Sequence, residues 1–192
     1  MGKIYAAIDD KIQKWVAKQH MFFVATAPRS DDGMVNLSPK GHDTLRMLDN
    51  HTLAFMDYGG SGIETIAHLR ENGRIVIMMC AFEGPPKIYR FHGRGTVITP
   101  LDKEFEQLAM QFDRTALGVR SIVRVDVQRV CESCGFGVPL YDYNTQRDTS
   151  PEYIRKIGPE KIRGYLAQMN GQSIDGLPGM TEEESGAYEG PV

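Results

Sequence analysis

Six segments of this chain carry the hydrophobic pattern of β-strands, and that pattern restricts the possible folds more than any other feature. Val119–Val130 alternates cleanly between apolar and polar residues, whereas Arg74–Phe82 is almost continuously apolar and predicts a strand buried on both faces. The other four strands are predicted at Met21–Ala27, Met34–Ser38, Thr52–Asp57 and Lys87–Ile98. Because most connections are short, neighbouring strands should run antiparallel. The sequence therefore predicts a mainly β fold, a six-stranded antiparallel barrel with few exposed edges.

Three helices are predicted around these strands from the 3.6-residue spacing of apolar side chains. The first covers about residues 3–18, where isoleucine or valine recurs every four residues and Trp15 packs beside that stripe. The second follows the third strand and ends at Gly73, a residue type that commonly terminates helices. The third runs from Leu101 to Phe112.

The C-terminal part of the chain differs in character from the rest. We expect a first unit at residues 1–147 and an appendage at residues 148–192 that contains two short helices. From Asn170 onward glycine, proline and acidic residues dominate, which predicts an extended or disordered arm. The last 28 residues hold five acids and no base, so the chain's net charge of −3 belongs to this arm.

Composition narrows the functional classes. With 22 Lys and Arg against 25 Asp and Glu, the chain is not a strongly basic nucleic-acid binder. The longest apolar run, Ile75–Phe82, is too short for a membrane-spanning helix. A charged N-terminus and only three cysteines favour a cytoplasmic protein without disulfides.

Two stretches have the residue types of an anion site. Tyr58–Gly62 is a glycine-rich loop that opens onto a helix, so backbone N–H groups, Ser61 and Thr65 can approach a ligand. A simple strand-to-helix turn explains the same glycines equally well. The second stretch places Ser38 and Lys40 at the end of a strand, where a lysine is often only solvated.

Cys131 and Cys134 form a C-x-x-C pair, but a zinc site needs four ligands and no second pair is present. Structural thiols and redox or metal chemistry both stay open for this pair. We predict no metal site, and the absence of G-x-S-x-G leaves serine hydrolase chemistry without support.

The order of these segments from Trp15 to Tyr143 resembles the pyridoxamine 5'-phosphate oxidase-like proteins, the FMN-binding split-barrel family. Four stretches carry the resemblance, at residues 21–43, 52–79, 87–98 and 131–143. The last, CESCGFGVPLYDY, is similar to a segment of an uncharacterised subgroup of flavin-nucleotide-binding proteins.

The resemblance implies a six-stranded split barrel that forms a homodimer, with FMN in clefts at the subunit interface and a small molecule as substrate. In such proteins the second strand and the loop and helix after the third strand hold the phosphate and ribityl chain. Carried onto this chain, the cofactor-binding residues are Val35, Asn36, Leu37, Ser38, Lys40, Asp57, Tyr58, Ser61, Gly62, Glu64 and Thr65. The flavin supplies the redox chemistry in an oxidoreductase of this kind, so no catalytic side chain is assigned.

This sequence departs from the family pattern at the phosphate. The vitamin oxidases carry two adjacent bases near the start of the helix, where this chain has Ile63-Glu64-Thr65, and an arginine where it has Asn36 or its neighbours. Both differences argue against pyridoxamine phosphate as the substrate. Compensation could come from Arg90, Arg94 or Arg147. The alternatives are a flavin-, haem- or deazaflavin-binding dimer without turnover, and a barrel that has lost its cofactor.

Overall fold

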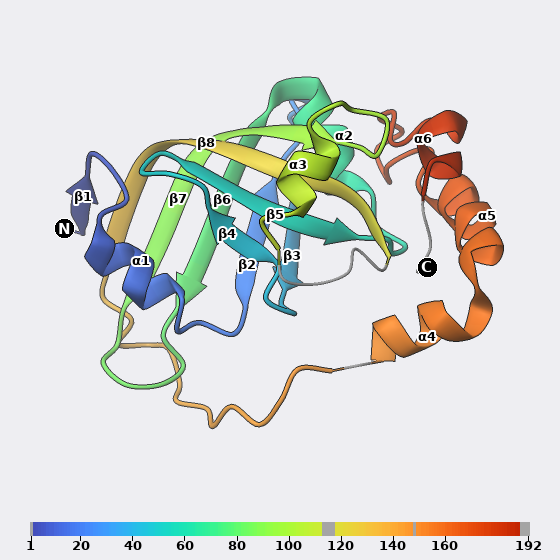
Figure 1. Cartoon of the computed structure of the whole chain (residues 1–192). Helices are drawn as coiled ribbons and strands as arrows, with labels where there is room; N and C mark the ends of the chain where they lie inside the picture. Colours follow the sequence, from blue (N-terminus) through green and yellow to red (C-terminus); the bar gives the residue numbers. More distant parts are fainter. Residues whose placement is uncertain (1, 113–117, 148, 189–192) are drawn as a thin grey trace.

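The computed structural model describes residues 2–112, 118–147 and 149–188, and its centre is one curled antiparallel sheet (Figure 1). Along the sheet the order is β3-β2-β6-β7-β8-β5-β4, and β1 pairs with β8. The strands are β1 Lys3–Tyr5, β2 Phe22–Thr26, β3 Asn36–Lys40, β4 Leu45–Met47, β5 Thr52–Tyr58, β6 Arg74–Cys80, β7 Ile88–Ile98 and β8 Val119–Ser133. The predicted mainly β, antiparallel split-barrel fold is confirmed.

The predicted number of six strands is wrong, because the sheet has eight. The two additional strands, β1 and β4, have three residues each, which is too short for a periodic pattern to be recognised. β1 lies where the first helix was expected to begin, and its Ile4 is 58% exposed although it continues the apolar spacing of the helix.

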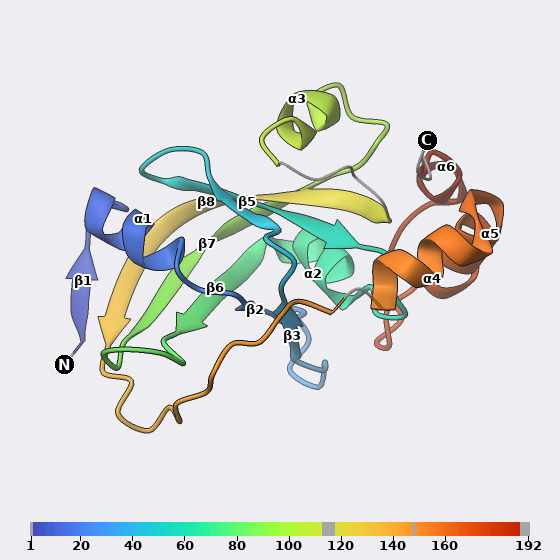
Figure 2. The same ribbon diagram turned by 60° about the horizontal axis from the view of Figure 1, so that its bottom comes forward.

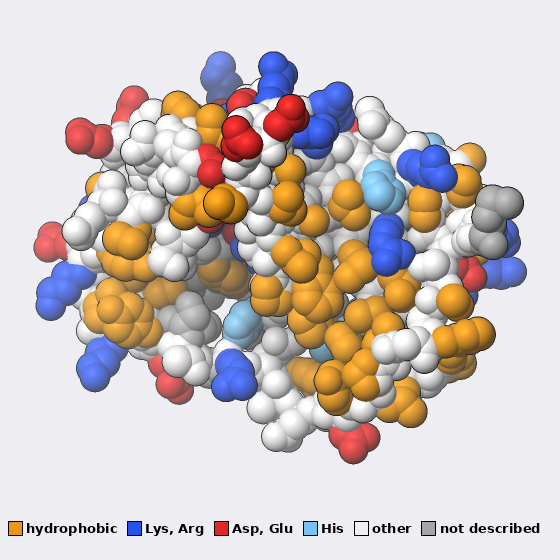
Figure 3. All heavy atoms as spheres, turned by 180° about the vertical axis from the view of Figure 1, so that it is seen from behind, with side chains coloured by type: hydrophobic (Ala, Val, Ile, Leu, Met, Phe, Trp, Pro, Cys, Tyr) orange, Lys and Arg blue, Asp and Glu red, His pale blue; other side chains and the backbone are white. Residues whose placement is uncertain are grey.

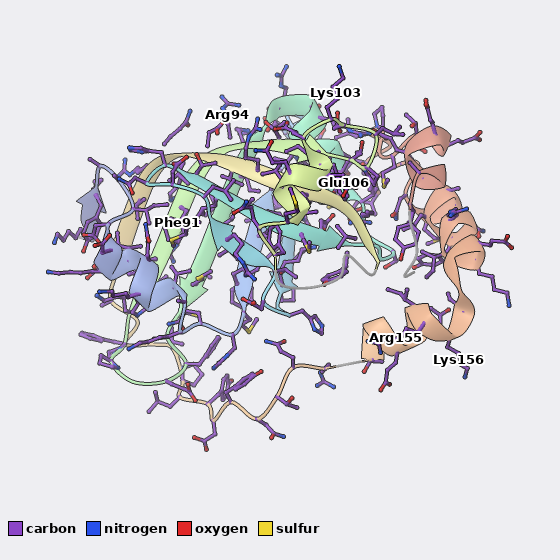
Figure 4. All side chains as sticks on the ribbon, in the orientation of Figure 1. Phe91, Arg94, Lys103, Glu106, Arg155 and Lys156 are labelled. Atoms are coloured by element: carbon purple, nitrogen blue, oxygen red, sulfur yellow. The ribbon has the colours of Figure 1, made fainter. Side chains whose placement is uncertain are left out.

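The sheet curls around its principal core. Alternate residues of β2, β6 and β7, such as Val24, Ile77 and Phe91, point inward and are fully buried. Figure 4 shows Phe91 within the sheet, whereas Lys103 and Lys156 point outward. The register between the long strand β7 and β8 shifts between His92 and Gly93. A side chain at Gly93 would meet the Asp126 carbonyl at 2.3 Å, so the strands approach closely there.

The first and third predicted helices are shorter than the sequence predicts, whereas the second has the predicted extent. They are α1 Asp10–Val16, α2 Glu64–Asn72, α3 Phe105–Ala109, α4 Thr149–Ile157, α5 Pro159–Met169 and α6 Glu182–Gly186. Asp9 caps α1, because its side chain accepts the Ile12 N–H, so this helix begins six residues later than its apolar stripe. Gly73 ends α2 with φ +70°, as predicted.

The arm expected to be extended or disordered is folded from Asn170 to Tyr188. Asn170, Met180 and Tyr188 are buried, and residues 170–180 form a closed turn that we call the C-terminal loop. Its stem is held by the N–H of Met180, which donates to the Asn170 carbonyl at 2.7 Å. Figure 2 shows α4, α5 and α6 grouped at one side of the sheet, away from α1. Packing against the barrel therefore outweighed the polar composition of this segment.

β3 and β4 end the path of the sheet, so each has one edge without a strand partner among the described residues. The opening between β3 and the β4–β5 hairpin is called the split here. Among the described strands β3 pairs only with β2, so the backbone N–H and C=O groups on its second edge have no strand partner. Both predicted anion-site stretches border the split. The stretch with Ser38 and Lys40 lies in β3, and Tyr58–Gly62 lies at the end of β5 and in the loop that follows.

Candidate functional site

At its first residue, β3 contacts the first turn of α2. The side-chain amide of Asn36 donates to Thr65 Oγ1 at 3.0 Å and to Thr26 Oγ1 at 3.2 Å, and Asn36 Oδ1 accepts from Ser38 Oγ at 3.0 Å. Thr26 Oγ1 also lies 3.0 Å from His68 Nδ1. Hydroxyl and amide groups from β2, β3 and α2 therefore form one neutral hydrogen-bonded cluster.

His68 anchors this cluster from inside the protein. Its side chain is fully buried, and Nε2 has no hydrogen-bond partner among the described residues. Burial lowers the pKa of His68, although Asp175 and Glu64 act in the opposite direction. The imidazole is therefore neutral at neutral pH, so the cluster carries no formal charge.

At its last residue, β3 is tied across the split by an ion pair. Lys40 Nζ lies 2.5 Å from Asp57 Oδ1, and Arg120 Nε donates to Asp57 Oδ2 at 2.9 Å. Asp57 and Arg120 are buried, whereas the Lys40 side chain is 19% exposed. The bond between Lys40 and Asp57 joins strands that are not neighbours in the sheet.

The charge state of Asp57 follows from these contacts. Burial by itself would raise the pKa of the carboxyl, but the positive charges of Arg120 and Lys40 outweigh it and hold the pKa at about 2. Asp57 is therefore an anion at all physiological pH values.

Asn170 connects this ion pair to the glycine-rich loop. Its Oδ1 accepts from Arg120 Nη1 at 2.8 Å, and its Nδ2 donates to the Gly60 carbonyl at 2.8 Å. Leu166 of α5 also packs so closely on Gly59 that a side chain there would meet Leu166 Cδ2 at 2.8 Å. The C-terminal segment therefore fixes the position of the loop that follows β5.

The structure brings together Asn36, Ser38 and Thr65 at one end of β3, and Lys40 with Asp57 at the other. The remaining predicted residues are spread around the split. Leu37 of β3 and Val35 just before this strand are exposed, Ser61 and Gly62 are exposed in the loop, and Tyr58 and Glu64 are half-buried. The buried carboxylate of Asp57 is paired with two cations, Lys40 and Arg120.

Four residues of this region were not among the sequence-predicted set: Thr26, His68, Arg120 and Asn170. Arg120 opens a strand that alternates cleanly, and the pattern alone gives it no more weight than Arg124 or Arg129. A buried arginine beside a buried aspartate is visible only when the two strands are paired. Of the compensating bases considered, Arg90 bonds Ser133 and Arg94 bonds the Asn72 carbonyl, so neither contacts this cluster through those bonds.

A cavity of about 900 Å³ begins beyond Lys40, and Arg147 lies in its wall. Stacked rings form part of the lining, with His20 against Tyr143 at 3.5 Å and Phe82 against Tyr141 at 5.4 Å between ring centroids. Gln146 fastens the extended segment that closes the cavity, since its amide donates to the His20 carbonyl at 2.8 Å. The cavity adjoins the basic end of β3.

The three cysteines are free thiols, and Cys131 Sγ lies 3.1 Å from Arg129 Nε. In the part of the chain that the structure describes, no three histidine, cysteine or acidic side chains gather in a way that could hold a metal ion. No described helix combines the length and apolar character needed to span a bilayer.

Comparison with known proteins gives the family. The family model of pyridoxamine 5'-phosphate oxidase matches residues 8–134. Over 196 aligned residues the chain is 34% identical to the pyridoxamine 5'-phosphate oxidase family protein ustO of Aspergillus flavus, covering 94% of this chain and 78% of that protein.

Two solved structures have the same fold at lower identity. HupZ of Group A Streptococcus is 21% identical with a TM-score of 0.51, over 64% of this chain and 91% of that one. A Lactobacillus delbrueckii protein named for pyridoxamine 5'-phosphate oxidase is 14% identical with a TM-score of 0.50, over 66% and 94%. Since the family model covers most of the sheet and the curated relative nearly the whole chain, this protein belongs to the pyridoxamine 5'-phosphate oxidase family.

Proposed function

We propose that this protein is an FMN-binding flavoprotein that acts as an oxidoreductase on a small molecule, with the flavin lying in the split along the free edge of β3. The observation that carries the proposal is the contact between the two stretches that the family resemblance names. Asn36 and Ser38 of β3 join Thr65 of α2, while Lys40 of β3 joins Asp57 of β5. Residues far apart in sequence thereby border one site.

The ring and ribityl parts of a flavin suit the donors and acceptors available there. An unpaired strand edge offers alternating N–H and C=O groups, which match the imide edge of an isoalloxazine ring. Ser38, Thr65 and Asn36 offer the hydroxyl and amide groups that a ribityl chain would need. Lys40, the last residue of β3, supplies a cation at the other end of the strand.

The phosphate end suits FMN less well. A phosphate of nearly −2 charge favours arginine or lysine, yet the first residue of α2 is the acidic Glu64. Arg120, which bonds the Gly60 carbonyl, is neutralised by Asp57. Neutral donors, such as the first N–H groups of α2, remain available at this end.

A bound flavin would supply the electron transfer, and the protein's own residues would hold and orient it. Lys40, kept rigid by Asp57, presents a fixed positive charge to the site. The neighbouring cavity, about 900 Å³ in volume and lined partly by aromatic rings, has room for a substrate next to that charge.

The test is a visible spectrum of the purified protein, followed by titration of the flavin-free protein with FMN. Yellow colour or saturable binding supports the proposal, and bleaching by a chemical reductant followed by reoxidation with a substrate would support turnover. A colourless protein that binds no flavin contradicts the proposal. A red protein with a haem spectrum favours the haem alternative.

Lys40→Met is expected to weaken flavin binding by roughly tenfold to a hundredfold, because a hydrogen bond to a charged group is worth about 1.5–3 kcal/mol. Asp57 keeps Arg120 as its partner in this variant, so the fold should survive. Lys103→Met, on the exposed side of the protein (Figure 4), is the control and should leave the affinity unchanged. Equal affinity in both variants would remove Lys40 from the site.

We further propose that two copies associate through the outer face of β3. Leu37 of this strand is 63% exposed, and Met34 and Val35 just before it are 59% and 74% exposed. Figure 3 shows hydrophobic side chains gathered on the face seen from behind. An edge strand with apolar exposed side chains is an aggregation hazard unless another surface covers it.

Leu37→Asp is therefore expected to convert a dimer into a monomer, because it places a charge within the apolar surface. Light scattering after size-exclusion chromatography measures the mass directly. Leu101→Asp introduces the same charge at another residue that is 48% exposed, and should not change the mass. A wild-type protein that runs as a monomer would rule out the association.

A further inference from the structure

The two ends of β3 have opposite electrostatic character. The end at Lys40 leads to the cavity, whose wall also contains Lys18, Lys87 and Arg147. At the Asn36 end the start of α2 carries an acid: Glu64 is its first residue, next to Thr65, which bonds Asn36. Arg74 and Arg94 line a cavity with Thr26 and Val35 at this end, but they donate to the carbonyls of Pro28 and Asn72. The N-terminus of a helix ordinarily attracts an anion, and the negative charge of Glu64 opposes that attraction here.

A second acid reaches this end from the C-terminal loop. Asp175 Oδ2 accepts the N–H of Met34 at 2.9 Å, and the neighbouring Ile174 N–H approaches Glu64 Oε1 at 3.4 Å. These contacts place the tip of the C-terminal loop against both the start of α2 and the residues before β3. The acidic charge is thus built into the site by the folded loop and not left on a solvated arm.

Nearby cations are already paired. Arg70 of α2 bonds Glu184 at 2.5 Å and also donates to the Gly179 carbonyl. Arg120 is held by Asp57 and Asn170, and Lys40 lies at the opposite end of the strand. Arg70, Arg120 and Lys40 are therefore paired with groups of the protein and not with a ligand at the Asn36 end.

We propose that Glu64 and Asp175 are specificity-determining residues that remove the usual preference for a phosphorylated flavin, so that riboflavin binds at least as tightly as FMN. The inference rests on the proposed function, because it assumes that a flavin lies along β3. The ring and ribityl chain are recognised by neutral donors and acceptors, whereas a phosphate dianion beside two carboxylates is repelled. The ligand class is a flavin whose ribityl end carries no charge.

Parallel titrations of the flavin-free protein with riboflavin and FMN at low salt test the inference. For the wild type we expect riboflavin to bind at least as tightly as FMN. The measured dissociation constant for riboflavin should therefore exceed that for FMN by no more than the error of such a comparison, about threefold. Glu64→Lys replaces repulsion by attraction and should shift the ratio toward FMN by about tenfold or more, with the gain reduced at high salt. Asp175→Asn should shift it in the same direction by less.

Each variant is its own folding control, because riboflavin binding must persist while FMN binding improves. Glu106→Lys makes the same charge change on exposed α3, which Figure 2 shows on the other side of the sheet from β3, and should leave the ratio unchanged. Two results would overturn the inference while leaving the proposed function intact. One is that the wild type binds FMN far more tightly than riboflavin, and the other is that Glu64→Lys leaves the ratio of the two affinities unchanged. Failure of both flavins to bind would overturn the proposed function as well.

If FMN is preferred and Lys40→Met abolishes that preference, the phosphate lies at the basic end of β3 and Glu64 has no role in specificity. That result would reverse the orientation of the ligand along the strand while leaving flavin binding intact. It is therefore distinguishable from a failure of the proposed function.

Discussion

Replacing Asp57 by Asn should lower the free energy of unfolding by about 3–5 kcal/mol, the cost of removing one partner from a buried ion pair. Arg120 is 4% exposed and would keep its charge without a counter-ion, while Lys40 would lose its contact across the split. Chemical denaturation measures the change. Asp43→Asn, which removes a largely exposed partner of Arg46, is the control and should cost about 0–1 kcal/mol.

The same prediction has a pH dependence. The pKa of Asp57 is lowered from 3.8 to about 2 in the folded protein, so its stabilising contribution is fully present above pH 3.8. It is lost as the pH falls through about 2. The stability difference between wild type and Asp57→Asn should therefore be constant near neutral pH and shrink below pH 3.8. A difference that is small at neutral pH would show that Asp57 is not paired as described.

Asn170→Leu should cost about 2–4 kcal/mol, because it removes the acceptor of the buried Arg120 Nη1 and the closer of the two donors to the Gly60 carbonyl. Only the longer bond of 3.4 Å between Arg120 Nη1 and the Gly60 carbonyl would then join these two groups. The substitution roughly conserves the volume of the side chain, so lost hydrogen bonds and not a cavity account for the effect. Thermal or chemical unfolding gives the cost.

Gln172→Leu is the matched control for Asn170→Leu, since its exposed amide only bonds the Gly176 carbonyl. It should cost less than about 1 kcal/mol. Because Asn170 holds the loop after β5, Asn170→Leu should also weaken flavin binding, whereas Gln172→Leu should not. Equal stability of the two variants would mean that the C-terminal loop does not support the site.

Periodicity was a reliable guide where strands and helices are long. β5, β6, β7 and β8 lie close to their predicted positions, because an apolar pattern over seven or more residues, alternating in β7 and β8 and nearly continuous in β6, reflects burial directly. Helical periodicity failed for β1 and for the start of α1, where Ile4 fits a helical stripe but pairs in a strand with Cys131. Three residues are too few for a pattern, and the local cap at Asp9 decided the helix boundary.

For the site, the candidate residues on β3 and after β5 came from residue type and family resemblance, and the structure brings Asn36, Ser38 and Thr65 together, as well as Lys40 and Asp57. Arg120 and Asn170 could not be selected, since an arginine on an alternating strand and an asparagine in a polar tail have no distinguishing pattern. Their importance comes from burial and mutual contact.

The amino-acid sequence by itself determined the antiparallel β architecture, the glycine-rich loop leading into α2 and the shortage of bases at the start of that helix. These properties depend on local pattern and residue identity. Only the tertiary structure decided that the C-terminal segment folds back, that Asn170 and Arg120 complete the site, and that Asp175 adds its charge beside Glu64. The physical reason is that these contacts join residues far apart in the sequence: Asp175 and Met34, like Asn170 and Gly60, are more than a hundred positions apart, and Arg120 and Asn170 are 50 apart. Such contacts depend on how the strands and the C-terminal helices pack.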